Sequence, residues 1–286
     1  MLRSVNHLRE FAIHATDGNI GHVKDFYFDD TGWTIRYLIV ETGSWLVNRK
    51  VLISPVAIAI PNWDSKTFPA TITMQQVKNS PDIDTEKPVS RQHEDDYLHY
   101  YEYPSYWGGA GLWGIGMYPN LMMQGYVNNT LPADTRTRDE GMNAAREHDQ
   151  DRHLDDDIHL RSCNVVIGYH LHASDGDIGD ITDMLVDEKT WAIRYLIVDT
   201  GSWWSGHKVL IAPQWIDDVQ WLEKHVTVRL TRQEVKDAPL FDINLPVDRE
   251  LEIDTHQHYR RAGYWLHEDS NQLITENDWL SESQKP

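Results

Sequence analysis

The sequence repeats itself at a fixed spacing of 158 residues, and this repeat limits what the chain can fold into. Leu2-Arg3-Ser4 returns as Leu160-Arg161-Ser162, and the hexapeptide IRYLIV of residues 35–40 returns at residues 193–198. At this spacing, 30 of the 62 positions from Leu2 to Trp63 are identical without any gap. Such agreement indicates a tandem duplication, so the chain should contain two copies of one structural unit.

Each copy has the pattern of short β-strands separated by turns. In the first copy we expect strands at residues 11–15, 23–29, 33–41, 50–54 and 67–73, with a tight turn at Asp17-Gly18. The unbroken apolar run of IRYLIV is typical of a strand that is covered on both faces. Thr231 with Glu234, and Thr73 with Gln76, have capping-box spacing and predict a short helical turn after the last strand. This spacing of strands favours a small β-barrel or sandwich.

The strand pattern resembles the PRC-barrel family. The resemblance is carried by the following residues of the first copy and their partners 158 positions later: Asp17, Gly18, Ile20, Gly21, Val23, Asp25, Asp29 and Ile35–Val40, then Asp175, Gly176, Ile178, Gly179, Ile181, Asp183, Asp187 and Ile193–Val198. The segments KVLISP and KVLIAP fit a later strand of the family. The family includes the cytoplasmic domain of the photosynthetic reaction-centre H subunit and the C-terminal domain of a ribosome maturation factor. The resemblance implies a small barrel that serves as a docking module, with no shared chemistry.

We therefore predict an all-β protein with two small PRC-like β-barrels related by pseudo-twofold symmetry, an aromatic and Gly-rich connector, and short helical turns. The predicted domains are barrel 1 at 1–82, the connector at 83–133, an acidic flexible linker at 134–158, barrel 2 at 159–240, and a second aromatic extension with a polar tail at 241–286. Residues 97–127 are rich in Tyr, Trp, Gly and Met. This stretch could pack on its own barrels, pair with a second chain, or contact a ligand or membrane surface.

Charge and composition narrow the function classes. A formal net charge of -19 disfavours nucleic-acid phosphates and anionic membranes as partners. There is no apolar run of about 18 residues for an integral membrane segment and no signal-peptide pattern, so we expect a cytoplasmic protein. The single cysteine, Cys163, excludes an intramolecular disulfide framework. It aligns with Val5, which predicts a buried small side chain.

No set of residues in the sequence points to catalysis, to a cofactor or to a metal. His170-x-His172 and His256-x-His258 would each present two imidazoles on one face of a strand, but scattered surface histidines are commoner than metal ligands. The acidic run Asp155–Asp157 lacks calcium-loop spacing. Gly108-Gly109-x-Gly111 lacks the lysine of a phosphate-binding loop.

The candidate interaction residues are arginines and aromatics. Arg36 and Arg194 stand inside apolar strands, where we expect pairing with a carboxylate such as Asp25 or Asp183, or snorkelling to the barrel rim; a recognition role is the alternative. The aromatic candidates are Trp45, Trp203, Tyr106, Trp107, Trp113, Tyr264 and Trp265.

The leading hypothesis is a non-enzymatic docking or assembly protein that binds a protein partner or itself, as a homo-oligomer. One alternative is a metal-assisted hydrolase that uses His and Asp groups. Another is an accessory factor that binds a small ligand in a photosynthetic or envelope assembly.

Overall fold

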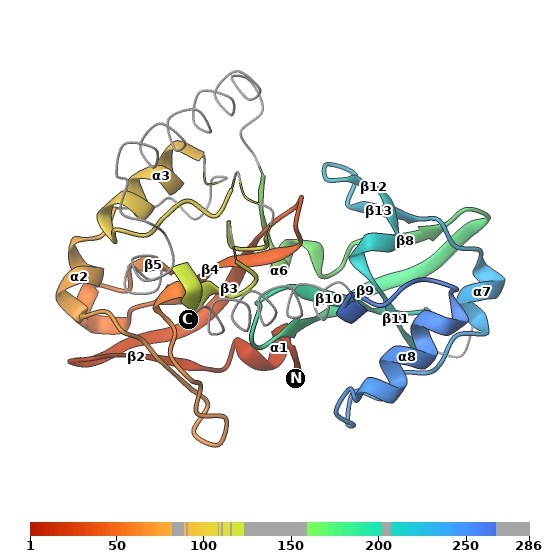
Figure 1. Cartoon of the computed structure of the whole chain (residues 1–286), viewed down its shortest axis with the longest axis horizontal. Helices are drawn as coiled ribbons and strands as arrows, with labels where there is room; N and C mark the ends of the chain where they lie inside the picture. The colour runs from red at the N-terminus through yellow and green to blue at the C-terminus, as the bar shows by residue number, and fades with distance from the viewer. Residues whose placement is uncertain are drawn as a thin grey trace, which may run out of the picture.

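The computed structural model shows a mostly β protein with two mixed sheets and a few short helices (Figure 1). It describes residues 1–81, 89, 91–107, 109, 111–114, 116–122, 159–201 and 207–266. The linker predicted at 134–158, the end of the polar tail at 267–286, and Trp203 lie outside the described residues. None of the described helices is long and apolar enough to cross a membrane.

Most elements follow the same order in the two halves of the described chain. Those of the first half are β1 (Leu2–Ser4), α1 (Val5–Leu8), β2 (Ala12–Ala15), β3 (Gly18–Asp29), β4 (Thr34–Glu41), η1 (Gly43–Leu46), β5 (Lys50–Ile53), η2 (Pro55–Ala57), β6 (Thr67–Pro69), α2 (Met74–Asn79), α3 (Arg91–Tyr100) and η3 (Pro119–Met122). Those of the second half are β7 (Leu160–Ser162), α6 (Cys163–Val166), β8 (His170–Ala173), β9 (Gly176–Asp187), β10 (Ile193–Asp199), β11 (Lys208–Ile211), η5 (Pro213–Trp215), β12 (Ile216–Gln220), β13 (His225–Val228), α7 (Arg232–Lys236) and α8 (Arg249–His258).

Each half builds one sheet around its long strand. The first sheet has the order β5-β4-β3-β2-β6, and the second has the order β11-β10-β9-β8-β13-β12. The pairs β2–β6 and β8–β13 are parallel, and the other pairs along these orders are antiparallel. The strands expected from the sequence are therefore present. Among the described residues the pairing runs from one edge strand to another and does not close into a ring.

Local sequence explains the central pairs of strands. All seven residues of β4 from Thr34 to Val40 are buried, as expected for a strand that is covered on both faces. Gly21 has a φ of 153°, and a Cβ atom there would lie 1.9 Å from the carbonyl oxygen of Glu41. Gly179 has the same conformation and the same close approach, to Asp199. Only glycine lets the two backbones come this close.

The first strand of each half pairs with the sheet of the other half. Strand β1 lies antiparallel to β9, with Leu2 opposite Asp187, and β7 lies antiparallel to β3, with Leu160 opposite Asp29. These are equivalent registers, because both members of each pair are shifted by 158 residues. The sequence did not predict this exchange, since the repeat shows that two strands are equivalent but not which sheet each one joins.

Buried carboxylates hold the exchanged segments. The Ser162 hydroxyl donates to Asp25 Oδ2 at 2.5 Å, and the Asn164 amide donates to Asp25 Oδ1 at 3.0 Å. The same serine caps α6 by accepting from the Val165 amide at 3.1 Å. Asp183 receives the equivalent bonds from Ser4 and Asn6. We call these two places the exchange junctions.

The hairpin tips also cross between the halves. The Ile35 amide donates to the Trp191 carbonyl at 2.9 Å, and the Ile193 amide donates to the Trp33 carbonyl at 2.7 Å. The Trp191 ring packs against Phe68 of the first half, with ring centroids 5.7 Å apart. The two sheets consequently share one continuous hydrophobic core. Cys163 is fully buried in this core, which confirms the prediction made from its alignment with Val5.

The helices are partly as expected. The capping boxes at Thr73 and Thr231 are both formed, so the predicted helical turns are confirmed as α2 and α7. Helix α3, in contrast, occupies part of the predicted connector, for which no helix was predicted, although Gly and Pro residues follow within residues 97–127. Those positions fall after Tyr100, so they end the helix and do not prevent it.

The first testable prediction concerns Asp25. Its burial raises the pKa of the Asp25 carboxyl above the usual value of 3.8, although Ser162, Phe26 and Asn164 donate hydrogen bonds to it. A raised folded-state pKa means that its contribution to stability is fully present at low pH and is lost as the pH rises through that value. The difference in free energy of unfolding between Asp25→Asn and wild type should therefore shift in favour of Asp25→Asn as the pH rises from about 4 to about 7.

Urea unfolding of both proteins across this pH range would measure the difference. The exposed Asp64→Asn serves as the control, because it removes the same charge without burial. A difference between Asp25→Asn and wild type that stays constant with pH would contradict the prediction.

Candidate docking surface

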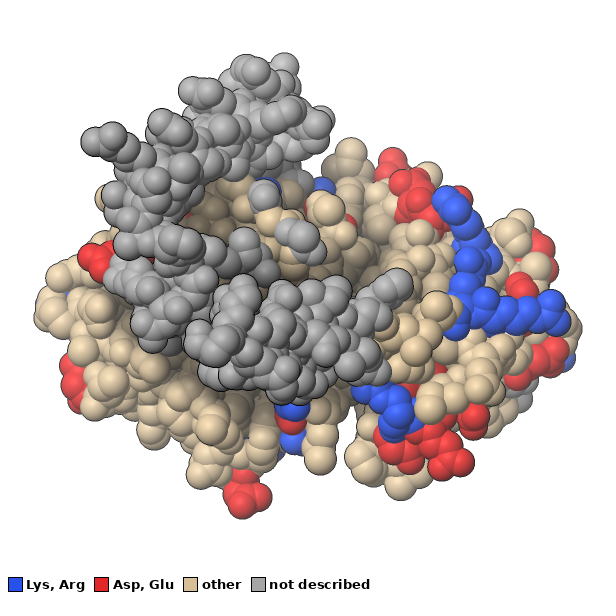
Figure 2. Space-filling model, in the orientation of Figure 1, with Lys and Arg blue, Asp and Glu red and all other residues tan. Residues whose placement is uncertain are grey.

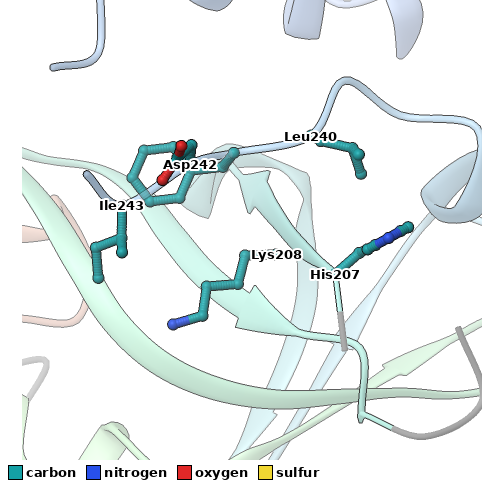
Figure 3. Close-up of a pocket in the computed structure, with 6 residues that line it drawn as sticks. His207, Lys208, Leu240, Asp242 and Ile243 are labelled. Carbon is teal, nitrogen blue, oxygen red and sulfur yellow. The ribbon is translucent and has the colours of Figure 1, made fainter. Parts of the chain in front are cut away.

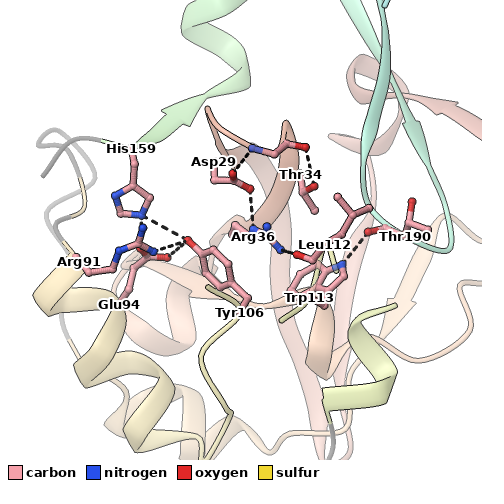
Figure 4. A network of polar contacts seen from close by, with 11 residues as sticks. Asp29, Thr34, Arg36, Arg91, Glu94, Tyr106, Leu112, Trp113, His159 and Thr190 are labelled. Carbon is pink, nitrogen blue, oxygen red and sulfur yellow. Dashed lines mark hydrogen bonds and ion pairs between the residues drawn. The ribbon is translucent and has the colours of Figure 1, made fainter. Parts of the chain in front are cut away.

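Arg36 is a buried cation on β4, with 4% of its surface exposed. Its Nε donates to Asp29 Oδ2 at 2.8 Å, and its Nη1 donates to the Leu112 carbonyl at 2.6 Å (Figure 4). The expected pairing with a carboxylate is present, but the partner is Asp29 and not Asp25. Asp25 lies opposite Ile39 in the β3–β4 register, whereas Asp29 lies opposite Thr34, much nearer to Arg36.

Two aromatic rings of the connector enclose the Arg36 guanidinium. The guanidinium carbon lies 3.9 Å from the centroid of the Tyr106 ring and 4.7 Å from that of Trp113. Trp113 is 2% exposed, and its indole N–H donates to the Thr190 carbonyl of the second half at 2.8 Å. The connector residues Tyr106 and Trp113 therefore pack within their own chain, and such burial stabilises a cation–π contact.

A carboxylate on α3 extends this network. The Tyr106 hydroxyl donates to Glu94 Oε1 at 2.7 Å, and Arg91 Nη1 lies 3.3 Å from Glu94 Oε2. The His159 imidazole also contacts Glu94 (Figure 4). Burial, followed by the charge of Glu94, raises the pKa of Tyr106 well above its usual value, so the phenol remains a hydrogen-bond donor.

The second half repeats this arrangement. The Arg194 guanidinium lies 3.9 Å from the Tyr264 ring centroid, and the Tyr264 hydroxyl donates to Glu252 Oε2 at 2.7 Å. Arg249 Nη1 lies 3.3 Å from Glu252 Oε1. Burial raises the pKa of Glu252, although Tyr264 and Tyr195 donate hydrogen bonds to it. Arg194 is held less closely than Arg36, because its Nη2 is 3.6 Å from Asp187.

Sequence reasoning missed the Arg–Glu pairs on the two helices. Arg91 and Arg249 are 158 residues apart, and so are Glu94 and Glu252. The signal was present as the spacing Arg-x-x-Glu in both copies, which places the two side chains on one face of a helix. The Arg-x-x-Glu spacing was overlooked because most of the other positions of the two helices differ between the copies.

The outermost parts of the two clusters are partly exposed. The Arg91 guanidinium lies over the Trp107 ring at 4.2 Å, and the Arg249 guanidinium lies over the Trp265 ring at 4.5 Å. The arginine side chains are 27% and 49% exposed, and both tryptophans are partly buried. We call these two pairs the Arg–Trp edges. Trp45 is placed elsewhere, with its indole N–H donating to the Ile20 carbonyl at 2.7 Å.

The histidine pairs do not converge as metal ligands. His170 and His172 contact separate carboxylates, Asp180 and Asp177. His256 and His258 lie on helix α8, so the common strand face that was expected for them does not exist. His256 Nε2 is 3.0 Å from the Tyr195 hydroxyl, and His258 Nε2 is 2.7 Å from the Glu234 carbonyl oxygen. Within the described part of the chain, no group of three His, Cys, Asp or Glu side chains could hold a metal ion. His148, His153 and Asp155–Asp157 lie outside it.

A shallow hollow of about 370 Å³ lies beside the edge strand β11 (Figure 3). It is lined by His207, Lys208, Leu240, Phe241, Asp242 and Ile243. The Phe241 amide donates to the Lys208 carbonyl at 2.9 Å, which holds one wall of the hollow against the strand. Its lining combines apolar side chains with the polar groups of His207, Lys208 and Asp242.

Charged side chains are unevenly spread over the face shown in Figure 2. On the face shown in Figure 2, Lys and Arg side chains gather over the second half, with Asp and Glu side chains beside them. Because positive and negative side chains lie next to one another, the described part of that face has no continuous basic stripe.

Comparison with known proteins gives one family match. Residues 5–67 match the model of the PRC-barrel domain, which agrees with the resemblance seen in the first copy. The matched range does not extend into the second half. No curated protein matches the chain.

The second testable prediction compares the two buried arginines. Arg36→Ala would leave Asp29 buried without its partner, so it should lower the free energy of unfolding by about 3–5 kcal/mol. Arg194→Ala should cost less, because Arg194 is farther from its carboxylate and its side chain is more exposed. Urea or thermal unfolding of both variants checks this order. Equal losses, or a larger loss for Arg194→Ala, would show that the ion-pair geometry does not set the cost.

Proposed function

We propose that this protein is a non-enzymatic docking or assembly module built from two PRC-like barrels in a pseudo-twofold arrangement. The match at residues 5–67 supports this assignment for the first barrel. For the second, the support is that element order and strand register recur at a spacing of 158 residues. The reciprocal contacts between the halves favour a rigid two-barrel platform over two independently mobile modules.

The observation that carries the proposal is the presence of two equivalent Arg–Trp edges. Arginine and tryptophan are the residue types that most often dominate the binding energy of protein interfaces. The buried Tyr106, Glu94 and Arg36 fix one edge, and Tyr264, Glu252 and Arg194 fix the other. Two identical sites on one rigid chain suit a bivalent partner or self-association into an oligomer.

The hollow beside β11 favours a second candidate function, that of an accessory factor that binds a small ligand. Leu240, Phe241 and Ile243 would contact an apolar body, and Lys208 would contact an anionic group. A co-purifying small molecule that Phe241→Ala releases would support this function. Among the residues that the structure describes, the metal-assisted hydrolase has no comparable observation in its favour.

The third testable prediction addresses the docking edges. Trp107→Ala and Trp265→Ala should each weaken binding to the protein partner, or self-association, by about tenfold or more, because each removes a hot-spot ring. The double variant should bind more weakly than either single variant, because bivalent engagement is lost. Light scattering measures self-association, and chemical cross-linking with mass spectrometry measures partner capture.

Trp45→Ala is the matched control, because Trp45 is also a partly buried tryptophan but lies outside both edges. Circular dichroism would verify that all the variants are folded. If the double variant retains the same partners and the same oligomeric state as wild type, the Arg–Trp edges are not the docking surface.

A further inference from the structure

The exchange junctions have the chemistry of a specific peptide-binding site. The segment from Leu2 to Leu8 adds a short strand to β9 and then turns into helix α1. Its Ser4 hydroxyl donates to Asp183 Oδ2 at 2.5 Å, and its Asn6 amide donates to Asp183 Oδ1 at 3.1 Å. The Asn6 side chain donates to the Thr182 carbonyl at 3.1 Å. The serine side chain is therefore recognised by a carboxylate, and the asparagine side chain is recognised by a backbone carbonyl.

The second junction uses the same atoms in the same roles. Ser162 and the Asn164 amide donate to Asp25, and the Asn164 side chain donates to the Lys24 carbonyl at 3.1 Å. We call residues 2–8 and 160–166 the donor segments. The acceptor sites are the strands that receive them, β9 with Asp183 and β3 with Asp25. Both donors contain Leu-Arg-Ser-x-Asn, so either donor can satisfy the polar groups of either acceptor.

Apolar burial and an ion pair add to this recognition. Val5 and Leu8 of the first donor are 0% and 3% exposed, and helix α1 packs on β9 of the other half. Arg3 Nε lies 3.0 Å from Glu188 Oε2, and its guanidinium lies over Trp63 at 3.9 Å. The strand pairing, the hydrogen bonds to Asp183 and Thr182 and the ion pair to Glu188 therefore join the first donor to the opposite half, whereas the Arg3–Trp63 contact lies within its own half.

We propose that the acceptor sites also bind the donor segment of a second copy of this chain, so that copies assemble by exchanging Leu-Arg-Ser-x-Asn segments. This proposal rests on the assembly function proposed above and gives it a partner. Each contact of a donor can be made by the same segment of another molecule, because the acceptor distinguishes only the residues presented to it. Exchange of an identical element is an economical route from monomer to oligomer.

The intramolecular donor has an advantage of effective concentration. A tethered segment competes as though it were present at about millimolar concentration, so a donor from another copy gains the site mainly at high protein concentration. Weakening the resident donor removes this advantage while leaving the acceptor intact. The two cases differ only in the occupancy of the acceptor, and this difference can be measured.

The fourth testable prediction uses a fluorescent peptide of residues 1–10 and the full-length chain. The double variant Ser4→Ala/Asn6→Ala loses the two side-chain hydrogen bonds of its own donor and keeps the bond from the backbone amide of residue 6 to Asp183. It should therefore bind the peptide at least about tenfold more tightly than wild type. Fluorescence anisotropy gives both affinities. A peptide with the same two substitutions should bind at least about tenfold more weakly than the normal peptide. Adding Asp183→Ala to the variant should abolish binding of the normal peptide.

Equal peptide binding by wild type and by the double variant would overturn the proposal, and so would binding that survives Asp183→Ala. Should the double variant fail to fold, Asn6→Ala alone removes one of the three polar contacts, the side-chain bond to the Thr182 carbonyl, and tests the same difference. In a mixture of two differently tagged copies, the variant should capture wild-type chain in proportion to concentration. Peptide binding without such capture would show that the acceptor does not take a second copy.

These outcomes are separable from those of the Arg–Trp edges. Loss of the partner in Trp107→Ala/Trp265→Ala with no peptide binding would leave docking intact and reject the exchange. Peptide binding and capture between copies that persist in the tryptophan variants would place assembly at the exchange junctions.

Discussion

The arrangement of this protein depends on two sets of hydrogen bonds to buried carboxylates. Ser4 and Asn6 donate to Asp183, and Ser162 and Asn164 donate to Asp25. An ionised carboxylate that is buried without donors would be strongly destabilising. Each half supplies the donors that the other half needs. The two sheets are thereby coupled, and the hairpin tips at Trp33 and Trp191 extend the coupling into one shared core.

Aromatic side chains of the two extensions stabilise the chain itself, because they pack against buried arginines of the sheets. Tyr106 and Trp113 enclose Arg36, and Tyr264 covers Arg194. A buried guanidinium needs such partners, because its loss of hydration must be offset by ion pairing, hydrogen bonds and ring contacts. What remains at the surface is the outer arginine and tryptophan of each cluster. Recognition is therefore proposed for residues whose positions are fixed by a buried network.

The two halves differ where helices α3 and α8 meet the 3-10 helices η2 and η5. In the first half Tyr97 of α3 is buried, and its hydroxyl accepts from the Ser54 amide at 3.0 Å, next to η2, which carries the small Ala57. In the second half the large ring is Trp215 of η5, and the helix carries Thr255 at the position of Tyr97. Exchanging a large residue for a small one on facing elements conserves the packed volume. The same element arrangement is thus packed by different side chains in the two halves.

The sequence by itself showed the internal repeat, predicted the strands and singled out candidate interaction residues. The spacing of 158 residues and the alternation of turns and apolar runs located both sheets, and the capping boxes located α2 and α7, because these are local signals. It also singled out Arg36, Arg194 and the aromatic pairs at Tyr106 and Tyr264. Three features are visible only in the tertiary structure. Strands β1 and β7 each pair with the sheet of the other half. Arg36 forms its ion pair with Asp29 and not with Asp25, and Trp113 is buried in the core. A repeat encodes two equivalent strands and two equivalent acceptors, so pairing within or between the halves satisfies the same local pattern. The choice depends on chain path and on burial over the whole molecule, which no short segment contains.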